Sequence, residues 1–253
     1  MRALFLALIA AATTAWAGSL EASSDAPSAP AHKSVREPVV LLHGLALNAT
    51  SMKKIATGLK KAGYRTCRVN YPSRDYPIDT LAVRLLPKIR RCFPKDVADS
   101  VPLHFVTHSM GGLLVRRLET LENAPRIGRV VMIAPPNQGS EVADSLAGTR
   151  FLELWGGPAG GQLGTGDAAV PRRLGTPEFE FGVIAATRSL EPWFSAMIPG
   201  RDDGKVAVKN TKLEGMRDFV EIPSTHTLVL WTDEAVKQVV RFLKTGRFEH
   251  GEM

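Results

Sequence analysis

Short apolar runs recur along the chain from about residue 38 onward, and stretches with helical periodicity separate them. Runs of this length, with few polar positions inside them, are typical of strands that are buried on both faces of a sheet. The predicted strands are Pro38–Leu42, Arg65–Val69, Leu103–Val106, Val130–Ala134, Phe181–Ala186 and Phe219–Ile222.

The intervening patterns predict helices from about Thr50 to Gly63, from Asp79 onward with a bend at Pro87, and from Met110 to Leu121. A last helix is predicted after Thr232, whose hydroxyl is a suitable N-cap. Strands that alternate with helices predict an α/β fold with a mostly parallel central sheet and helices on both faces. Ligands bind such sheets at the carboxyl ends of the strands, so a functional site is expected on the loops after Leu42, Val106 and Ala186.

The two ends of the chain differ from this pattern. Residues 1–17 combine Arg2, a short apolar run and Ala15-Trp16-Ala17, which predicts a signal peptide and export to the periplasm or beyond the cell. A retained membrane anchor is the alternative, but the apolar run is short for a membrane span. Residues 18–35 are predicted to be a flexible linker, residues 36–248 the catalytic domain and residues 249–253 a tail.

Composition and charge narrow the class of protein. Among 253 residues, 44% are hydrophobic and 23% charged, as in ordinary globular domains. Cleavage after residue 17 would reduce the 32 lysines and arginines to 31 against 25 acids, a net charge of +6. This charge favours an anionic membrane surface as a possible partner. The basic residues are scattered without interleaved aromatic residues, so nucleic-acid binding has little support, and a monomer is the default expectation.

Cys67 and Cys92 are the only cysteines. An oxidising compartment and an even number of cysteines favour a disulfide between them, with two free thiols as the alternative. Their spacing with the histidines matches no zinc pattern, and no cofactor is expected.

The strongest chemical pattern is Thr107-His108-Ser109-Met110-Gly111-Gly112, between a predicted strand and a predicted helix. A serine on such a sharp turn projects its hydroxyl from the sheet edge, and small neighbours let the backbone adopt the strained turn. Thr107 stands where a glycine is usual. An ordinary serine N-cap is the alternative interpretation.

A second pattern, His43-Gly44-Leu45, follows the first strand directly. The glycine permits a tight turn, after which a backbone N–H can point at the site. Acyl transfer requires two donors for the oxyanion of its tetrahedral intermediate, and the amides of Leu45 and Met110 are the candidates. Taken alone, His43-Gly44 is also compatible with a generic turn at a strand end.

From Pro38 to Phe248 the chain resembles the α/β-hydrolase superfamily, in particular small secreted bacterial lipases and esterases with a minimal lid. The resemblance is carried by four segments: Val40–Gly44, Asn70-Tyr71-Pro72-Ser73, His108–Gly112 and Ala134–Ser140.

The resemblance implies a catalytic triad in the chain order serine, acid, histidine. Ser109 would be the nucleophile and His226, on the loop before the last helix, the base. The acid falls in Asp202-Asp203-Gly204, where the family pattern selects Asp203 over Asp202; Glu191 is a further competitor.

These roles predict a serine hydrolase that cleaves small-molecule or lipid carboxylic esters through an acyl-enzyme. An acyltransferase, thioesterase or amidase could use the same residues, and an inactive binding module could share the fold. Residues 145–178 would lie near the site. Their Phe151, Leu154 and Trp155 are expected to complete the core rather than line an acyl pocket, and the glycine-rich stretch Gly156–Gly166 is expected to be a mobile loop.

Overall fold

The computed structural model describes residues 36–94 and 101–251. The predicted signal peptide (residues 1–17) and the predicted linker (residues 18–35) lie outside the described residues. No helix in the described part of the chain is long and apolar enough to cross a membrane.

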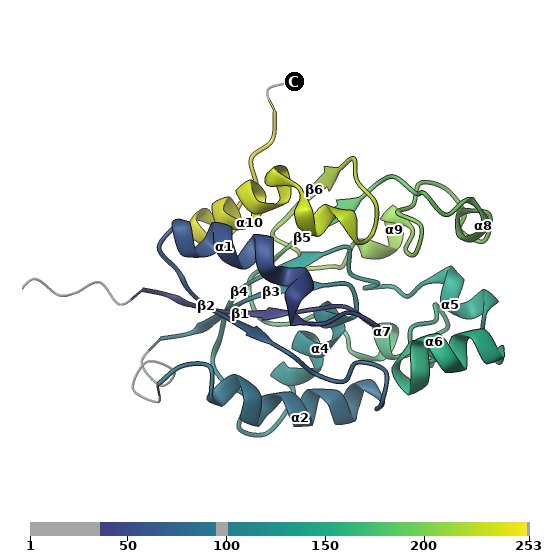
Figure 1. Ribbon diagram of the computed structural model, residues 1–253, viewed down its shortest axis with the longest axis horizontal. Coiled ribbons are helices and arrows are strands. Elements are labelled where there is room, and N and C mark those ends of the chain that lie inside the picture. Colours follow the sequence, from purple (N-terminus) through teal and green to yellow (C-terminus); the bar gives the residue numbers. More distant parts are fainter. Residues whose placement is uncertain (1–35, 95–100, 252–253) are drawn as a thin grey trace, which may run out of the picture. The chain divides into compact units, whose positions relative to one another are not determined.

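Six parallel strands form one sheet in the order β2-β1-β3-β4-β5-β6 among the described residues (Figure 1). This confirms the predicted α/β fold with a parallel sheet. The strands are β1 (Pro38–Leu42), β2 (Arg65–Val69), β3 (Leu103–His108), β4 (Ile127–Ile133), β5 (Phe181–Ala186) and β6 (Asp218–Ile222).

Helices connect the strands and cover the sheet. Four pack on its faces: α1 (Lys53–Lys61), α2 (Ile78–Arg90), α4 (Met110–Glu119) and α10 (Asp233–Thr245). The remaining helical elements are η1 (Ala49–Met52), α5 (Glu141–Ser145), α6 (Arg150–Gly160), α7 (Val170–Arg173), α8 (Pro192–Ser195), α9 (Val208–Thr211) and η2 (Leu228–Trp231).

Side chains from β1, β3, β4 and β5 alternate between two apolar clusters, one on either face of the sheet. In β1, Val40 and Leu42 pack in the cluster that holds α2 and α4, whereas Val39 and Leu41 pack in the cluster that holds α1 and α10. Figure 1 shows these two helix pairs on opposite faces of the sheet. Burial on both faces explains why the strands read as continuous apolar runs.

Several element boundaries differ from those expected. The strand that begins at Leu103 extends through His108, because Thr107 and His108 continue the pairing with β4. The helix after Ser109 ends at Glu119 rather than at Leu121.

The glycine-rich stretch was expected to be a loop, and this is wrong for its first half. Residues 156–160 form the second part of α6, which is interrupted at Gly157 by a positive φ of 58°. A Cβ on Gly157 would lie 1.9 Å from the carbonyl oxygen of Arg74. Glycine therefore serves close packing here rather than mobility.

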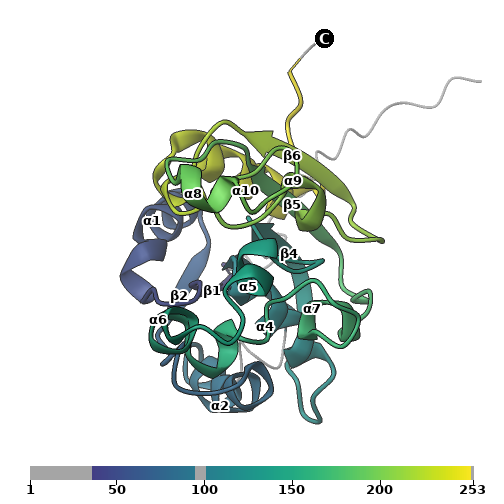
Figure 2. The ribbon, with the colours of Figure 1, turned by 90° about the vertical axis from the view of Figure 1, so that its right-hand side faces the viewer.

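The sheet positions β1 and β3 so that their carboxyl ends are adjacent. The chain passes from β1 outward to β2 and then returns to the other side of β1 with β3, so the connections diverge between these two strands. Such a switch point is where α/β sheets bind ligands. Helices α5 to α8 lie around this edge, toward the viewer in Figure 2.

Candidate active site

Ser109 occupies the turn between β3 and α4 in a backbone conformation that L residues rarely adopt, with φ 50° and ψ −125°. The turn is held by hydrogen bonds from the Ser109 amide to the Ile133 carbonyl and from the Gly112 amide to the Ser109 carbonyl. Its hydroxyl does not cap the helix. The ordinary N-cap interpretation is therefore excluded, and the strain is of the kind that is found at functional sites.

The two glycine positions near Ser109 bring the end of β1 against this turn. A Cβ on Gly111 would lie 2.9 Å from the Leu42 carbonyl oxygen, and one on Gly44 would lie 2.7 Å from Nδ1 of His108. Ordinary Cβ contacts are longer, so any side chain here would push the two loops apart. Glycine is required at both positions by this close approach.

Thr107, which stands where a glycine is usual, fits because its neighbour on the next turn is small. Its side chain is buried, and a Cβ on Gly112 would lie 3.6 Å from the Thr107 hydroxyl. The space beside Gly112 thus accommodates the larger residue.

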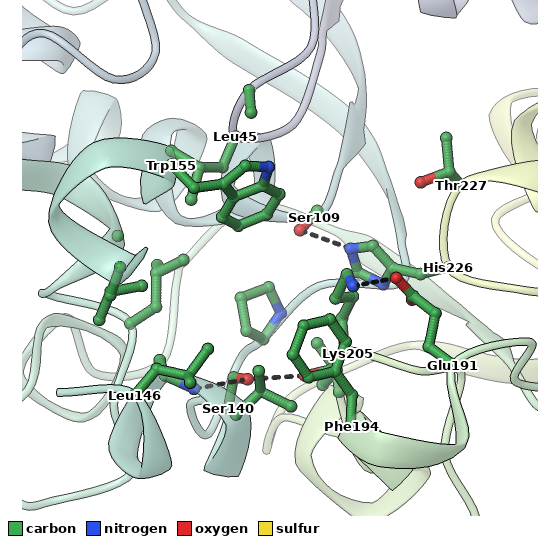
Figure 3. Close-up of a pocket in the computed structure, with 18 of the residues that line it drawn as sticks. Leu45, Ser109, Ser140, Leu146, Trp155, Glu191, Phe194, Lys205, His226 and Thr227 are labelled. Atoms are coloured by element: carbon green, nitrogen blue, oxygen red, sulfur yellow. Dashed lines mark hydrogen bonds and ion pairs between the residues drawn. The ribbon is translucent and has the colours of Figure 1, made fainter. Parts of the chain in front are cut away.

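Ser109, His226 and Asp203 form a continuous chain of hydrogen bonds. Nε2 of His226 lies 2.9 Å from Oγ of Ser109, a contact marked by a dashed line in Figure 3. Nδ1 of His226 lies 2.7 Å from Oδ2 of Asp203. With Nδ1–H donating to the carboxylate, Nε2 is left to accept the serine hydroxyl proton. The three residues are 7%, 8% and 1% exposed, so little water competes for these bonds.

The structure places Asp203, and neither of its competitors, against His226. The other carboxylate oxygen of Asp203 accepts the amides of Lys205 and Val206, and its carbonyl accepts the amide of His226. Both carboxylate oxygens therefore have hydrogen-bond donors, which fix the carboxylate in the orientation that faces His226.

The two competing acids bind elsewhere. Asp202 accepts the Ser195 hydroxyl and the Gly204 amide, so it fixes the turn rather than the base. Glu191 forms an ion pair with Lys205, with 2.6 Å between Oε1 and Nζ.

Leu45 and Met110, the residues expected to supply the oxyanion donors, flank Ser109. Met110 is the first residue of α4, and Leu45 follows Gly44 on the loop after β1. Within residues 36–94 and 101–251, neither amide donates a hydrogen bond to a protein acceptor. Both N–H groups are thus available to a ligand, and their role in stabilising an oxyanion stays a prediction.

The loop that carries Leu45 is fixed by the Asn70–Ser73 segment. The Ser73 hydroxyl accepts the Ala46 amide at 3.0 Å, and the Tyr71 hydroxyl donates to the His43 carbonyl. Tyr71 also stacks on the His43 ring, with the ring centroids 4.0 Å apart. Burial lowers the pKa of His43 and so keeps this imidazole neutral.

His108 contributes to the site in a way that the sequence did not indicate. Its Nε2–H donates to the main-chain carbonyl of His226 at 2.8 Å, and the two rings lie 5.0 Å apart. Burial, and secondarily the nearby His226, lowers the pKa of His108 to about 3. A neutral donor therefore holds the backbone of the candidate base.

A cavity of about 400 Å³ opens at Ser109 and His226. Most of its wall is apolar, and Phe151 and Trp155 of α6 line it while remaining partly exposed. The expectation that these side chains complete the core is therefore wrong, and Leu154 beside them is 76% exposed. The polar side chains of the wall include the Lys205–Glu191 pair, which Figure 3 shows near His226.

Comparison with known protein families matches residues 39–249 to the "Alpha/beta hydrolase family". The chain belongs to the alpha/beta hydrolase family. A parallel sheet with a strained serine turn at its switch point is how this family presents a nucleophile, so the local geometry agrees with the membership.

Solved structures of a lipase, a phospholipase and a carboxyl esterase resemble the chain at low sequence identity. The mature lipase BlEst2 of Bacillus licheniformis is 19% identical with a TM-score of 0.59, over 83% of this chain and 91% of that chain. Phospholipase PlaB of Legionella pneumophila is 16% identical with a TM-score of 0.69, over 83% of this chain and 60% of that chain. The metagenomic carboxyl esterase MGS0156 is 19% identical with a TM-score of 0.61, over 75% of this chain and 64% of that chain. At these identities the likeness shows the fold alone, and no curated protein sequence matches the chain.

The predicted disulfide is confirmed. Cys67 in β2 is bonded to Cys92 just after α2, with 5.6 Å between the Cα atoms. No group of three or more histidine, cysteine, aspartate or glutamate side chains in the described residues is placed to hold a metal ion.

Proposed function

We propose that this alpha/beta hydrolase cleaves carboxylic esters, with Ser109 as nucleophile, His226 as general base and Asp203 as the acid that orients it. The hydrogen-bonded chain from Ser109 through His226 to Asp203 is the observation that carries the proposal. A serine hydroxyl is a weak nucleophile, and an adjacent imidazole that removes its proton activates it.

In the first step, Oγ of Ser109 attacks the ester carbonyl carbon while Nε2 of His226 takes the hydroxyl proton. The resulting imidazolium is stabilised by the Asp203 carboxylate at Nδ1. The amides of Leu45 and Met110 would bind the oxyanion, each contributing about 3 kcal/mol if they match other such donors.

The protonated His226 then donates its proton to the departing alcohol, which leaves Ser109 acylated. A water molecule attacks the acyl-enzyme while His226 accepts a proton from it. His226 then returns this proton to Oγ of Ser109 as the bond between Oγ and the acyl carbon breaks, and the carboxylic acid is released. No cofactor is required for any of these steps.

The wall of the cavity favours an apolar acyl group. Leu146, Leu152 and Leu163 line it together with Trp155, and these side chains would bury a hydrocarbon chain next to Ser109. Esters with aliphatic acyl chains are therefore the proposed substrates.

The test is the turnover of 4-nitrophenyl esters of graded acyl length, with the Ser109→Ala variant beside the unmodified protein. We expect the unmodified protein to hydrolyse these esters and the variant to do so at least about 10³-fold more slowly. Residual activity near the unmodified level would show that another residue is the nucleophile. Labelling of Ser109 by a fluorophosphonate separates an enzyme from a binding module, which would stay unlabelled.

Other acyl-transfer reactions could use the same three residues. The same assays extended to thioesters and amides, and to added alcohol acceptors, distinguish hydrolysis of esters from thioesterase, amidase and acyltransferase activity. Faster turnover of any of these over the matched ester would contradict the proposal.

Export is proposed as well, on the strength of the first 17 residues and of the Cys67–Cys92 disulfide, a bond that is typical of oxidising compartments. Fractionation of the producing cells would test this, because a protein that stays reduced in the cytosol would contradict it.

A further inference from the structure

Exposed apolar side chains gather around the mouth of the active-site cavity. Among the described residues eight large apolar side chains are strongly exposed, and one of them, Val83, lies on α2, away from the cavity. The other seven form what we call the apolar rim: Phe151, Leu154, Trp155, Leu190, Trp193, Leu228 and Trp231.

The rim comes from three segments that are far apart in sequence. Leu154 lies beside Trp155 in α6, Trp193 beside Phe194 in α8, and Leu228 beside Thr227 at the start of η2. Trp155, Phe194 and Thr227 all line the cavity. In all three segments an exposed apolar side chain therefore adjoins a residue of the cavity wall, and Figure 2 shows α6 and α8 on the side toward the viewer.

All three tryptophans of the described residues belong to the rim, and Trp193 is 61% exposed. A tryptophan has a large apolar body and one N–H donor, so it is most stable where hydrocarbon meets water. Exposure of isolated apolar residues is ordinary, but an exposed group of seven around one opening indicates a surface that contacts an apolar phase or partner.

A basic groove continues the rim on one side. The groove shares Ala46 and Leu47 with the cavity wall and is lined by Trp231 of the rim. Three lysines line it as well, Lys53, Lys54 and Lys61, against the single carboxylate of Asp233.

The charge in the groove is only partly neutralised. Lys54 pairs with Asp233 at 2.8 Å, whereas Lys53 and Lys61 are exposed. The groove thus carries a net positive charge next to the side chain of Trp231.

We propose that the apolar rim and the basic groove dock onto the surface of an anionic lipid bilayer, with the mouth of the cavity facing the lipid. Apolar side chains would enter the boundary between headgroups and acyl chains, and the lysines would attract anionic headgroups. A symmetric contact between two copies is a poorer fit, because it would bring two lysine-rich grooves into one interface.

The docking surface does not depend on catalysis. The further step, that lipids drawn from the bilayer enter the cavity as ester substrates, rests on the proposed function.

Binding is best measured in the Ser109→Ala background, so that lipid is not consumed during the experiment. The assay is co-sedimentation with vesicles of phosphatidylcholine alone and of phosphatidylcholine and phosphatidylglycerol in equal parts. We expect binding to the anionic vesicles that weakens as salt is added, because salt screens the lysine contribution.

Two sets of variants separate the apolar from the charged contribution. Replacement of Leu154, Trp193 and Leu228 by serine should weaken binding by about tenfold or more, with Val83→Ser as the matched control. Replacement of Lys53 and Lys61 by glutamine should weaken binding by about fivefold for each lysine, with Lys244→Gln, at the far end of α10, as the control. Thermal unfolding midpoints equal to those of the controls would show that the variants fold.

Absence of vesicle binding, or equal binding by the rim variant and the Val83→Ser control, would overturn the proposal. Equal binding to neutral and anionic vesicles would overturn its charged part. A dimer that the rim variant loses, without vesicle binding, would assign the surface to a second copy. Vesicle binding by a protein that hydrolyses no ester would refute the proposed function and leave the docking surface intact.

Discussion

Nε2 of His108 donates a hydrogen bond to the main-chain carbonyl of His226, a residue 118 positions later in the chain. The residue directly before the candidate nucleophile thereby fixes the backbone of the candidate base. Small displacements of a base from its nucleophile are costly, since even about 1 Å can reduce a rate by about 10²-fold. His108 is thus a positioning residue that acts through His226.

Replacement of His108 by leucine removes this donor, and we expect kcat to fall by about tenfold to a hundredfold with little change in KM. His108→Gln retains an N–H that can reach the carbonyl and should recover most of the lost kcat. Steady-state kinetics on one ester would measure both. A leucine variant as active as the glutamine variant would show that the hydrogen bond does not position His226.

The adjacent aspartates offer an internal control for the identity of the acid. Asp203→Asn would replace the acceptor at Nδ1 of His226, so we expect kcat to fall by about 10³- to 10⁴-fold. Asp202→Asn changes only the turn toward Ser195 and Gly204, and its kcat should stay within a few-fold of the unmodified protein. The opposite order of effects would move the acid role to Asp202.

Residues at the ends of buried strands could be located from the sequence. Apolar runs fix where a strand ends, and parallel strands bring their carboxyl ends to one edge, so the turn that carries Ser109 could be placed at that edge. The roles of His226 and Asp203 followed from the resemblance to alpha/beta hydrolases, which implies the chain order serine, acid, histidine. The choice of Asp203 over Asp202 also required the resemblance to alpha/beta hydrolases, because the two aspartates are adjacent and the pattern of apolar positions does not distinguish them.

The surroundings of these residues could not be predicted in the same way. The periodicity of the sequence indicates that Phe151 and Trp155 lie on one face of a helix, but it does not indicate which part of the molecule that face contacts. Here it meets the cavity. Gly157 lies in a glycine-rich stretch, a composition that is typical of loops. Its role depends instead on the close approach of the Arg74 backbone, from a segment far away in the chain.

Stability should fall on acidification because buried imidazoles are held neutral. Burial lowers the pKa of His108 to about 3 and also lowers that of His43, whereas an imidazole in the unfolded chain titrates near about 6.5. Between these values the unfolded state binds protons that the folded state does not. The free energy of unfolding therefore rises with pH through this window and is fully restored above about 6.5.

Urea unfolding of the unmodified protein and of His108→Gln at a series of pH values measures the contribution of this residue. We expect a slope of up to about 1.4 kcal/mol per pH unit from His108 between about pH 3 and 6.5, and its loss in the variant. Parallel curves for the two proteins would mean that His108 takes up a proton in the folded state at the same pH as in the unfolded chain.

The Cys67–Cys92 bond joins β2 to the end of α2 and closes a segment of 25 residues. Closing a loop of this length in the unfolded chain reduces its entropy, which corresponds to about 3 kcal/mol of folding stability. We expect the double variant Cys67→Ser with Cys92→Ser to lose about this much free energy of unfolding, as measured by chemical denaturation.

The unmodified protein treated with a thiol reductant is the matched control, because it lacks the bond but keeps both side chains. If the covalent link is what stabilises the fold, the reduced protein and the double variant unfold at the same denaturant concentration, below the oxidised protein. A reduced protein as stable as the oxidised one would show that packing around β2 and α2 suffices without the bond.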